Sequence, residues 1–335
     1  MQFGKVRDVV ASRLALQGME YPVPARANRL DFMLGAMTLV ALTLLAVTGI
    51  VLTQFYDPAP LSAHASVKYI ITQLPLVTYL RDIHVASAST AMALVLVHLA
   101  AVFWRGGFRA PREGLWWSGV LLLALLFGLT FTGTVLRADQ EAVEALAHGL
   151  AGAKMVGRLG EPFRASFSDS SPLLTRYYSL HVSVLPLALV ALLALHLWLI
   201  RHLGVSAAGT AQAPFRSHLR LLGGFGMLLV AIVAALGLVG EASLLAPGVE
   251  GVEVTKPAWP FLFIYAAENK SGMSAILLAP ILVFGFLALV PVLDRGPGPL
   301  ARVTRVAGVL LLMALVAATI YAALAPPQSH LQMRM

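Results

Sequence analysis

The sequence predicts an all-α integral membrane protein in which a four-helix bundle is followed by three further transmembrane helices. Its 335 residues are 59% hydrophobic and 12% charged, about half the charged share of a soluble domain. Seven uncharged apolar runs of about 20 residues are long enough to cross a bilayer. The chain has no cysteine, which excludes disulfides, iron–sulfur ligation, thiolate metal sites and thioether attachment of a cofactor.

The seven predicted spans alternate direction and place the two termini on opposite sides. They lie near 32–54, 83–104, 114–136, 180–200, 221–240, 274–293 and 306–325, and none contains Asp, Glu, Lys or Arg. Of the 24 Lys and Arg, 14 fall in the N-terminal arm and the short connections on its side. The positive-inside rule therefore predicts a cytoplasmic N-terminus. We expect a multi-pass protein of the bacterial inner (cytoplasmic) membrane. The dispersed charge favours membrane orientation over nucleic-acid binding.

The spans divide the chain into three predicted regions. Residues 1–31 interleave charges with Val and Leu and predict an amphipathic arm on the cytoplasmic surface. Residues 32–205 hold four spans and residues 206–335 hold three, and the composition changes after Arg220. The Gly- and Ser-rich loop 137–179 is too long for a simple turn, and we expect small helices there that cover part of the outer surface.

Four histidines stand inside two of these spans, which is costly unless they are functional. His84 and His98 are 14 residues apart in the second span, and His181 and His196 are 15 apart in the fourth. Each pair is separated by about 21–22 Å along its helix and shares one face. Both spans run from outside to inside, so His84 is level with His181 and His98 with His196. Two facing pairs suit two macrocycles whose iron is held by imidazole from both sides, as in electron-transferring haems.

Other interpretations of these histidines are weaker. A single histidine in an apolar helix is often a hydrogen-bonded structural residue, but four matched in depth are not explained in that way. Zinc would find only two ligands and no carboxylate at each level. A transporter with proton-relay histidines predicts no haem. A reduced-minus-oxidised spectrum separates that class from the others.

Glycines in the first and third spans repeat the histidine spacing. The members of each pair are 14 residues apart: Gly35 and Gly49, and Gly119 and Gly133. Glycine lets a flat ring approach the backbone, although small residues also serve ordinary helix–helix contacts. The coincidence with the histidine period favours the cofactor interpretation.

Several segments carry a family resemblance. They include LTRYYSLH at 174–181, followed by LHLWLIRHLG, together with TGTVLRADQ at 132–140, RDIH at 81–84 and RGGF at 105–108. With these in order, the chain resembles cytochrome b, the dihaem subunit of Rieske–cytochrome b complexes. Its front half resembles cytochrome b6, and its back half is similar to subunit IV of b6f complexes, fused here in one chain.

The resemblance implies a four-helix haem-binding bundle plus three further helices. It implies two non-covalent b-type haems, an outer one on His84 and His181 and an inner one on His98 and His196. Arg81 is implied as the partner of a haem propionate. Met33 stands where the b6 type has the cysteine that binds an extra haem.

The segment KPAWPFLFIY at 256–265 resembles the family's outer quinol loop with its PEWY-type motif. Pro257 and Trp259 remain, but Ala258 replaces the motif glutamate and Pro260 replaces the tyrosine. Oxidising quinol releases two protons that a base must accept, and alanine cannot do so. Either another acid takes this role, or the outer pocket no longer oxidises quinol in the usual way. The candidate acids on the outer side are Glu250, Glu253, Glu268 and Asp139.

By this resemblance, the chain is an electron-transfer subunit of a quinol-oxidising, quinol:cytochrome c reductase-like complex of respiration or photosynthesis. It would move electrons across the membrane between two b haems and quinone sites. The implied partners are a Rieske iron–sulfur protein, a c-type cytochrome or another redox subunit, quinone or menaquinone, membrane lipid and a second copy in a homodimer.

An alternative function is a haem b electron conduit that links the quinone pool to a partner oxidoreductase and has a degenerate outer site. On the inner side, four polar residues near the ends of the first and fourth spans are candidates for a quinone pocket, with interfacial anchoring as the alternative. They are Arg29, Asp31, Arg201 and His202.

Overall fold

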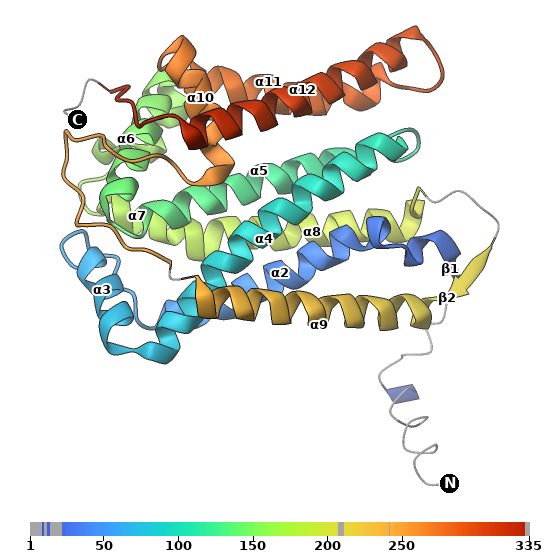
Figure 1. Ribbon diagram of the computed structural model, residues 1–335, viewed down its shortest axis with the longest axis horizontal. Coiled ribbons are helices and arrows are strands. Elements are labelled where there is room, and N and C mark those ends of the chain that lie inside the picture. Colours follow the sequence, from blue (N-terminus) through green and yellow to red (C-terminus); the bar gives the residue numbers. More distant parts are fainter. Residues whose placement is uncertain (1–8, 10–11, 14–21, 207–210, 241, 332–335) are drawn as a thin grey trace.

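The computed structural model describes residues 9, 12–13, 22–206, 211–240 and 242–331, so most of the predicted arm 1–31 lies outside the described residues. Within this part of the chain, seven helices are long and apolar enough to cross a membrane, which confirms the seven predicted spans. They are α2 (Leu30–Leu52), α4 (Pro75–Arg105), α5 (Glu113–Val135), α7 to α8 (Leu173–Leu203), α9 (Phe215–Val239), α11 (Ala275–Leu293) and α12 (Pro299–Leu324). All seven run roughly along the long axis of the molecule (Figure 1).

Helix α4 extends well beyond the apolar run that predicts it. Helix α4 begins at Pro75, a residue suited to the first helical turn because it has no N–H to leave unpaired. It continues through Arg81 and Asp82, and it ends at Gly106, which adopts the left-handed conformation with φ of 69°. Hydropathy marks only the part of a helix that contacts lipid tails, so the polar ends of such helices escape it.

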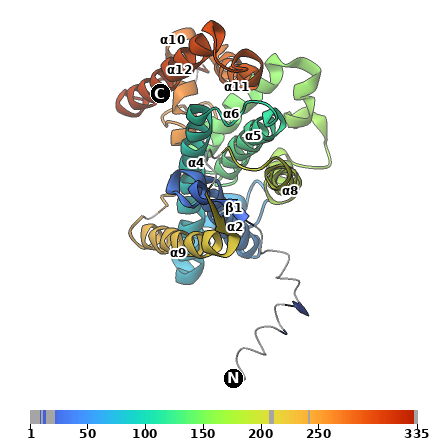
Figure 2. The ribbon, with the colours of Figure 1, turned by 90° about the vertical axis from the view of Figure 1, so that its right-hand side faces the viewer.

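The first four spans form two packed pairs. Helix α2 lies against α4, and α5 lies against α8 (Leu185–Leu203), while α9 packs on α2 and α4 and α11 packs on α5. The end-on view shows α9 and the group of α10, α11 and α12 on opposite sides of α4 and α5 (Figure 2). Two indole N–H groups join α5 to α11: Trp116 donates to the Leu287 carbonyl at 2.7 Å and Trp117 to that of Ala288 at 2.9 Å.

A buried carboxylate at the end of α11 forms ion pairs with two neighbouring segments. Asp294 is fully buried and accepts hydrogen bonds from Arg109 Nη2 at 2.6 Å and Arg305 Nε at 3.0 Å. Arg109 belongs to the connection between α4 and α5, and Arg305 to α12. The cluster therefore joins the front and back halves of the chain at one end of the molecule.

The two ends of the molecule differ in structure. One carries a short antiparallel ribbon of β1 (Pro22–Pro24) and β2 (Gln212–Pro214). The other carries the short helices α3 (Ala63–Gln73), α6 (Gln140–Met155) and α10 (Leu262–Ser271), seen together at the left of Figure 1. Helix α6 begins where the carboxylate of Asp139 accepts the Ala142 N–H at 3.0 Å. The small helix expected in loop 137–179 is thus present.

Candidate functional site

Each of the four histidines lies against one of the four glycines. On α4, His98 and His84 face α2, and on the fourth span His181 and His196 face α5. A Cβ atom built on each glycine would lie 3.5 Å or less from the Cε1 atom of its histidine. The distances are 3.1 Å for Gly35 and His98, 3.1 Å for Gly49 and His84, 2.9 Å for Gly133 and His181, and 3.5 Å for Gly119 and His196.

Hydroxyl groups orient three of these histidines, and the sequence analysis missed them. Thr48 Oγ1 lies 2.9 Å from His84 Nδ1, and Thr132 Oγ1 lies 3.0 Å from His181 Nδ1. Both hydroxyls are positioned to donate to a carbonyl of their own helix, which leaves the oxygen to accept the Nδ1–H. Each Nε2 then keeps a lone pair for a metal. The sequence contained a pattern that could have identified these threonines, because each immediately precedes one of the glycines.

The same arrangement occurs once more at the other depth. Ser118, just before Gly119, places its Oγ 2.8 Å from His196 Nδ1. The fourth histidine differs, because Leu34 precedes Gly35 and the buried Nδ1 of His98 has no hydrogen-bond partner among the described residues. The pair His98 and His196 is therefore less firmly oriented by the protein than the pair His84 and His181.

The spacing of the outer pair fits a shared metal. The ring centres of His84 and His181 are 6.4 Å apart, with an angle of 66° between the rings. Bonds of about 2 Å from both imidazoles to one metal would separate the ring centres by about 6.3 Å, given bond lengths near 1.3 Å within each ring. The observed distance between the ring centres therefore agrees with the distance expected for a metal shared by the two side chains.

A π-helical turn explains the 15-residue step in the fourth span. His181 lies in the turn Leu180–Val184, between α7 (Leu173–Ser179) and α8, and Pro186 follows in the first turn of α8. A π turn inserts one residue into an α-helix. The 15 residues from His181 to His196 therefore cover nearly the same rotation as the 14 from His84 to His98, and both histidines keep the face that packs on α5.

Arg81 lies one turn before His84 on α4 and is buried. Its Nη1 donates to the Ala242 carbonyl at 2.5 Å and lies 3.5 Å from Asp82 Oδ1. Its Nη2 is buried and has no partner within the part of the chain that is described. An unpaired guanidinium nitrogen here fits an acidic group of a bound cofactor, and the propionate role of Arg81 stays a prediction.

The inner candidates are only partly brought together. Asp31 Oδ1 accepts from Arg29 Nε at 3.2 Å, and Asp31 Oδ2 accepts from Arg105 Nη1 at 3.1 Å. The ring of His202 instead stays within its own helix, where Nδ1 donates to the Trp198 carbonyl at 2.8 Å. Arg105 was missing from the sequence-based set, and Arg201 remains a prediction.

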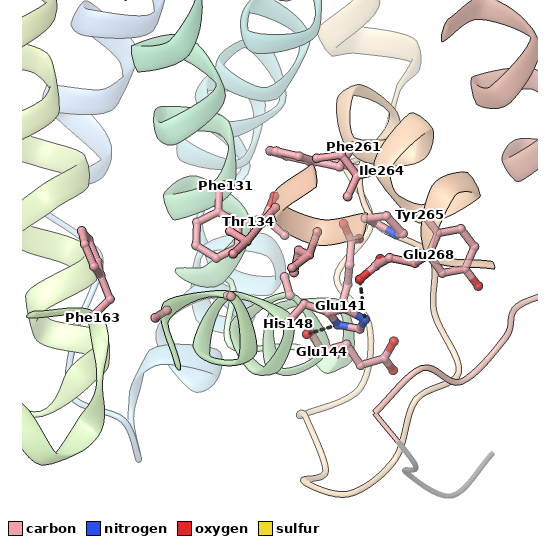
Figure 3. A pocket seen from close by; sticks show the side chains of 18 of the residues that line it. Phe131, Thr134, Glu141, Glu144, His148, Phe163, Phe261, Ile264, Tyr265 and Glu268 are labelled. Carbon is pink, nitrogen blue, oxygen red and sulfur yellow. Dashed lines mark hydrogen bonds and ion pairs between the residues drawn. The ribbon is translucent and has the colours of Figure 1, made fainter. Parts of the chain in front are cut away.

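A cavity of about 380 Å³ lies beside the outer histidine pair, between α5, α6 and α10 (Figure 3). Phe131 and Tyr177 line it with ring centres 5.9 Å apart, and Tyr177 lies one turn before His181. Pro257 and Ala258 also line the cavity. Pro260 is buried and Trp259 is 37% exposed, in the short 3₁₀ turn Trp259–Phe261 that leads into α10.

Two of the four predicted outer acids do not reach this cavity. Asp139 is fully buried at the start of α6, where it also accepts the Leu245 N–H at 3.2 Å. Glu250 is exposed in the loop that precedes the cavity. Glu253 and Glu268 do line it. The structure adds Glu144 and His148 of α6, which the sequence analysis had not singled out.

The carboxylates in the cavity have different surroundings. Glu144 is nearly buried and accepts the N–H groups of Val254 and Thr255, both at 2.9 Å. Burial would raise the pKa of Glu253, but hydrogen bonds from Leu331, His330 and Ser329 outweigh it and lower the pKa. Burial raises the pKa of Glu268 to about 7, against the opposing effect of His148. Only Glu268 combines a raised pKa with an unpartnered buried oxygen, Oε1, among the described acids.

Comparison with known proteins decides the family. The family model described as cytochrome b/b6/petB matches residues 19–204. The chain belongs to the cytochrome b/b6 family. It is therefore a multi-pass membrane electron-transfer cytochrome b, and the family implies b-type haem.

Relatives and a solved structure agree with this assignment. Cytochrome b6 of Heliobacterium mobile is 33% identical over 207 residues, which cover 61% of this chain and 93% of the relative. Cytochrome b6 of Heliobacterium modesticaldum is 32% identical over 198 residues, which cover 58% of this chain and 93% of the relative. The structure of a hyperthermophilic respiratory Complex III superposes with a TM-score of 0.77 at 21% identity, covering 96% of this chain and 90% of that one. This match shows that the back half shares the fold as well.

Proposed function

We propose that this cytochrome b is the dihaem subunit of a quinol-oxidising complex. The observation that carries the proposal is the pair of matched histidine sites. Each of the four imidazole rings lies against a glycine, and three of the four Nδ1 atoms are hydrogen-bonded to a hydroxyl group. His84 and His181 would hold the outer b haem, and His98 and His196 the inner one. When bound, the haems would supply one-electron redox chemistry in a low-dielectric interior.

The residues of the chain position and shield these groups. The glycines leave room for a flat ring at helix contacts. Thr48, Thr132 and Ser118 fix the tautomer of their histidines, with Nε2 left as the metal ligand. The orphaned Nη2 of Arg81 is placed to bind an acidic substituent near His84. The largely apolar cavity lined by Phe131 and Tyr177 would take a quinol ring.

The fold family supports further expectations about assembly. We expect a Rieske-type iron–sulfur protein and a c-type cytochrome, or another redox subunit, to dock on the outer side. We expect quinone or menaquinone as substrate, a homodimer, and a bacterial cytoplasmic membrane location with the N-terminus inside. A second quinone pocket is expected near Arg29 and Asp31.

The loop at 257–260 is also compatible with a second function, that of an electron conduit. Ala258 contributes only a methyl group to the cavity where the family motif has a carboxylate. A haem b conduit between the quinone pool and a partner oxidoreductase would need only one working quinone site, and it fits this loss. The two functions differ in whether the outer cavity oxidises quinol.

Two measurements test these proposals. Purified, fully loaded protein should bind two haems per chain with low-spin bis-histidine spectra; one haem, or a different axial ligand, contradicts the dihaem proposal. Quinol:cytochrome c reductase turnover that an outer-site inhibitor blocks supports quinol oxidation. Haem reduction that persists unchanged with that inhibitor supports the conduit instead.

A further inference from the structure

We propose that Glu268 accepts a hydroxyl proton from quinol in the outer cavity, and that His148 passes this proton on toward Glu253. The inference rests on the proposed quinol-oxidising function. It assigns to α10 the role that a motif glutamate at position 258 would have had, at a different wall of the same cavity.

Two features distinguish Glu268 from the other acids: it lines the cavity, and one of its carboxylate oxygens has no hydrogen-bond partner among the described residues. Glu268 and Ala258 line the same cavity, and Figure 3 shows Glu268 directed from α10 toward His148 on α6. Glu144 uses both carboxylate oxygens on the loop before Pro257, and Glu253 binds the chain at 329–331. Glu141, which also lines the cavity, is paired with Arg137 at 2.5 Å. Oε1 of Glu268 remains buried and unpartnered in the described structure.

A chain of titratable groups leads away from Glu268. Its Oε1 lies 4.0 Å from His148 Nε2, and that nitrogen lies 3.2 Å from Glu253 Oε1. Glu253 Oε1 is in turn 3.3 Å from Nδ1 of His330, whose side chain is 6% exposed. The 4.0 Å gap is too long for a hydrogen bond, but catalytic hydrogen bonds often tighten only when substrate binds.

The tautomer of His148 suits a relay. Its Nδ1 donates to the Glu144 carbonyl at 2.9 Å, so Nε2 is the nitrogen that gains and loses a proton. This Nε2 is buried and makes no hydrogen bond of good geometry with a described residue. The carboxylate of Glu253 lies 3.2 Å from this Nε2 and is the next proton-accepting group along the chain.

The charges around Glu268 set its proton affinity. It faces His148 and Glu144 of α6, Glu253 of the preceding loop, and Tyr265 of its own helix. It also faces His330 of the C-terminal segment, which has a ring nitrogen within 4.8 Å of its carboxylate. Burial is the main cause that raises its pKa, His148 opposes this rise and Glu253 adds to it, and the resulting pKa is about 7. A base that changes protonation near neutral pH can accept a proton in one step and release it in the next.

The proposed step moves a proton only. The quinol O–H bond breaks, an O–H bond forms on Glu268, and the electron pair of the broken bond stays on the quinol oxygen. The two electrons of the quinol would leave to one-electron acceptors, which in the proposed complex would be the haem held by His84 and His181 and a redox centre of a partner subunit.

The test compares Glu268→Gln with a matched control, Glu250→Gln, in the intact complex or in native membranes. Quinol-dependent haem reduction per haem is measured from about pH 5 to about pH 9. In the wild type, the rate of haem reduction should increase as the pH rises through about 7. E268Q should lose this rise and fall by about 100-fold, as expected for a lost general base, while E250Q keeps both rate and profile. His148→Gln should slow turnover less.

A rescue variant makes the assignment specific to proton acceptance. Ala258→Glu in the E268Q background returns a carboxylate to the cavity and should restore most of the rate. If E268Q were slow only because of a structural defect, this second substitution would not restore the rate. Infrared titration gives a readout independent of turnover. One protonated carboxyl that titrates near pH 7 in wild type, and is perturbed by a hydroxyquinone analogue, should vanish in E268Q.

The outcomes separate the two proposals. Wild-type protein that does not reduce its haem with quinol contradicts the quinol-oxidising function itself. Wild type that turns over while E268Q keeps its rate and pH profile overturns the assignment of Glu268 alone. If E268Q does not assemble, the wild-type infrared titration decides, and absence of a carboxyl titrating near neutral pH overturns the inference.

Discussion

Replacing Gly133 by alanine should selectively damage the outer haem site. The new Cβ would lie 2.9 Å from His181 Cε1, so the ring must withdraw by about 0.6 Å to reach a normal carbon–carbon contact. That movement would stretch the 3.0 Å hydrogen bond between His181 Nδ1 and Thr132 beyond its useful range. The loss of about 1 kcal/mol for the hydrogen bond adds to about 1–3 kcal/mol for overpacking.

The expected result is a loss of outer-haem affinity of roughly 30- to 700-fold, since about 1.4 kcal/mol corresponds to a factor of ten. Gly119→Ala is the matched control on the same helix, because its Cβ would lie at an ordinary 3.5 Å from His196 Cε1. Haem content per chain and stepwise redox titration of the difference spectrum measure both sites. Equal haem loss in the two variants, or full outer occupancy in Gly133→Ala, would refute the steric reasoning.

Three further predictions can be checked on the same preparations. His181→Ala should remove the outer haem and keep most of the inner one; a spectrum that loses both equally contradicts the pairing. Thr132→Val should weaken the outer haem by about 10- to 100-fold as an orienting partner is lost, whereas Thr130→Val, whose hydroxyl bonds only its own helix, should not. Because the pKa of Glu253 is lowered in the folded protein, its stabilising effect should be present above the unfolded pKa and disappear as acid protonates it. A Glu253→Gln variant should show no such acid-dependent step in detergent melting curves.

The sequence predicted the spans well because hydropathy is a local property. Helices α2, α5 and α11 begin and end within about two residues of the apolar runs. The helix ends were harder to predict, as at α4, where Arg81 and Asp82 continue the helix outside any apolar run. The depth matching of the histidines was also readable, since rise per residue is constant along a helix.

The cavity groups were only partly predictable. Glu268 was one of four acids with no local feature to separate it from Glu250 or Asp139. Its distinction is that every neighbouring acid is already hydrogen-bonded or exposed, which depends on loops that meet only after folding. His148 sits 120 residues before Glu268 in the sequence, and nothing in α6 alone marks it.

The sequence by itself determined the membrane class, the seven spans and the four histidines with their glycines, because each follows from composition or from periodicity along a single helix. Only the tertiary structure decided that a π turn absorbs the extra residue between His181 and His196, and which acid of the outer cavity is left without a partner. Those features depend on how one helix packs against another and on which polar groups the fold happens to pair. Such contacts join residues far apart in the chain, and no local pattern records them.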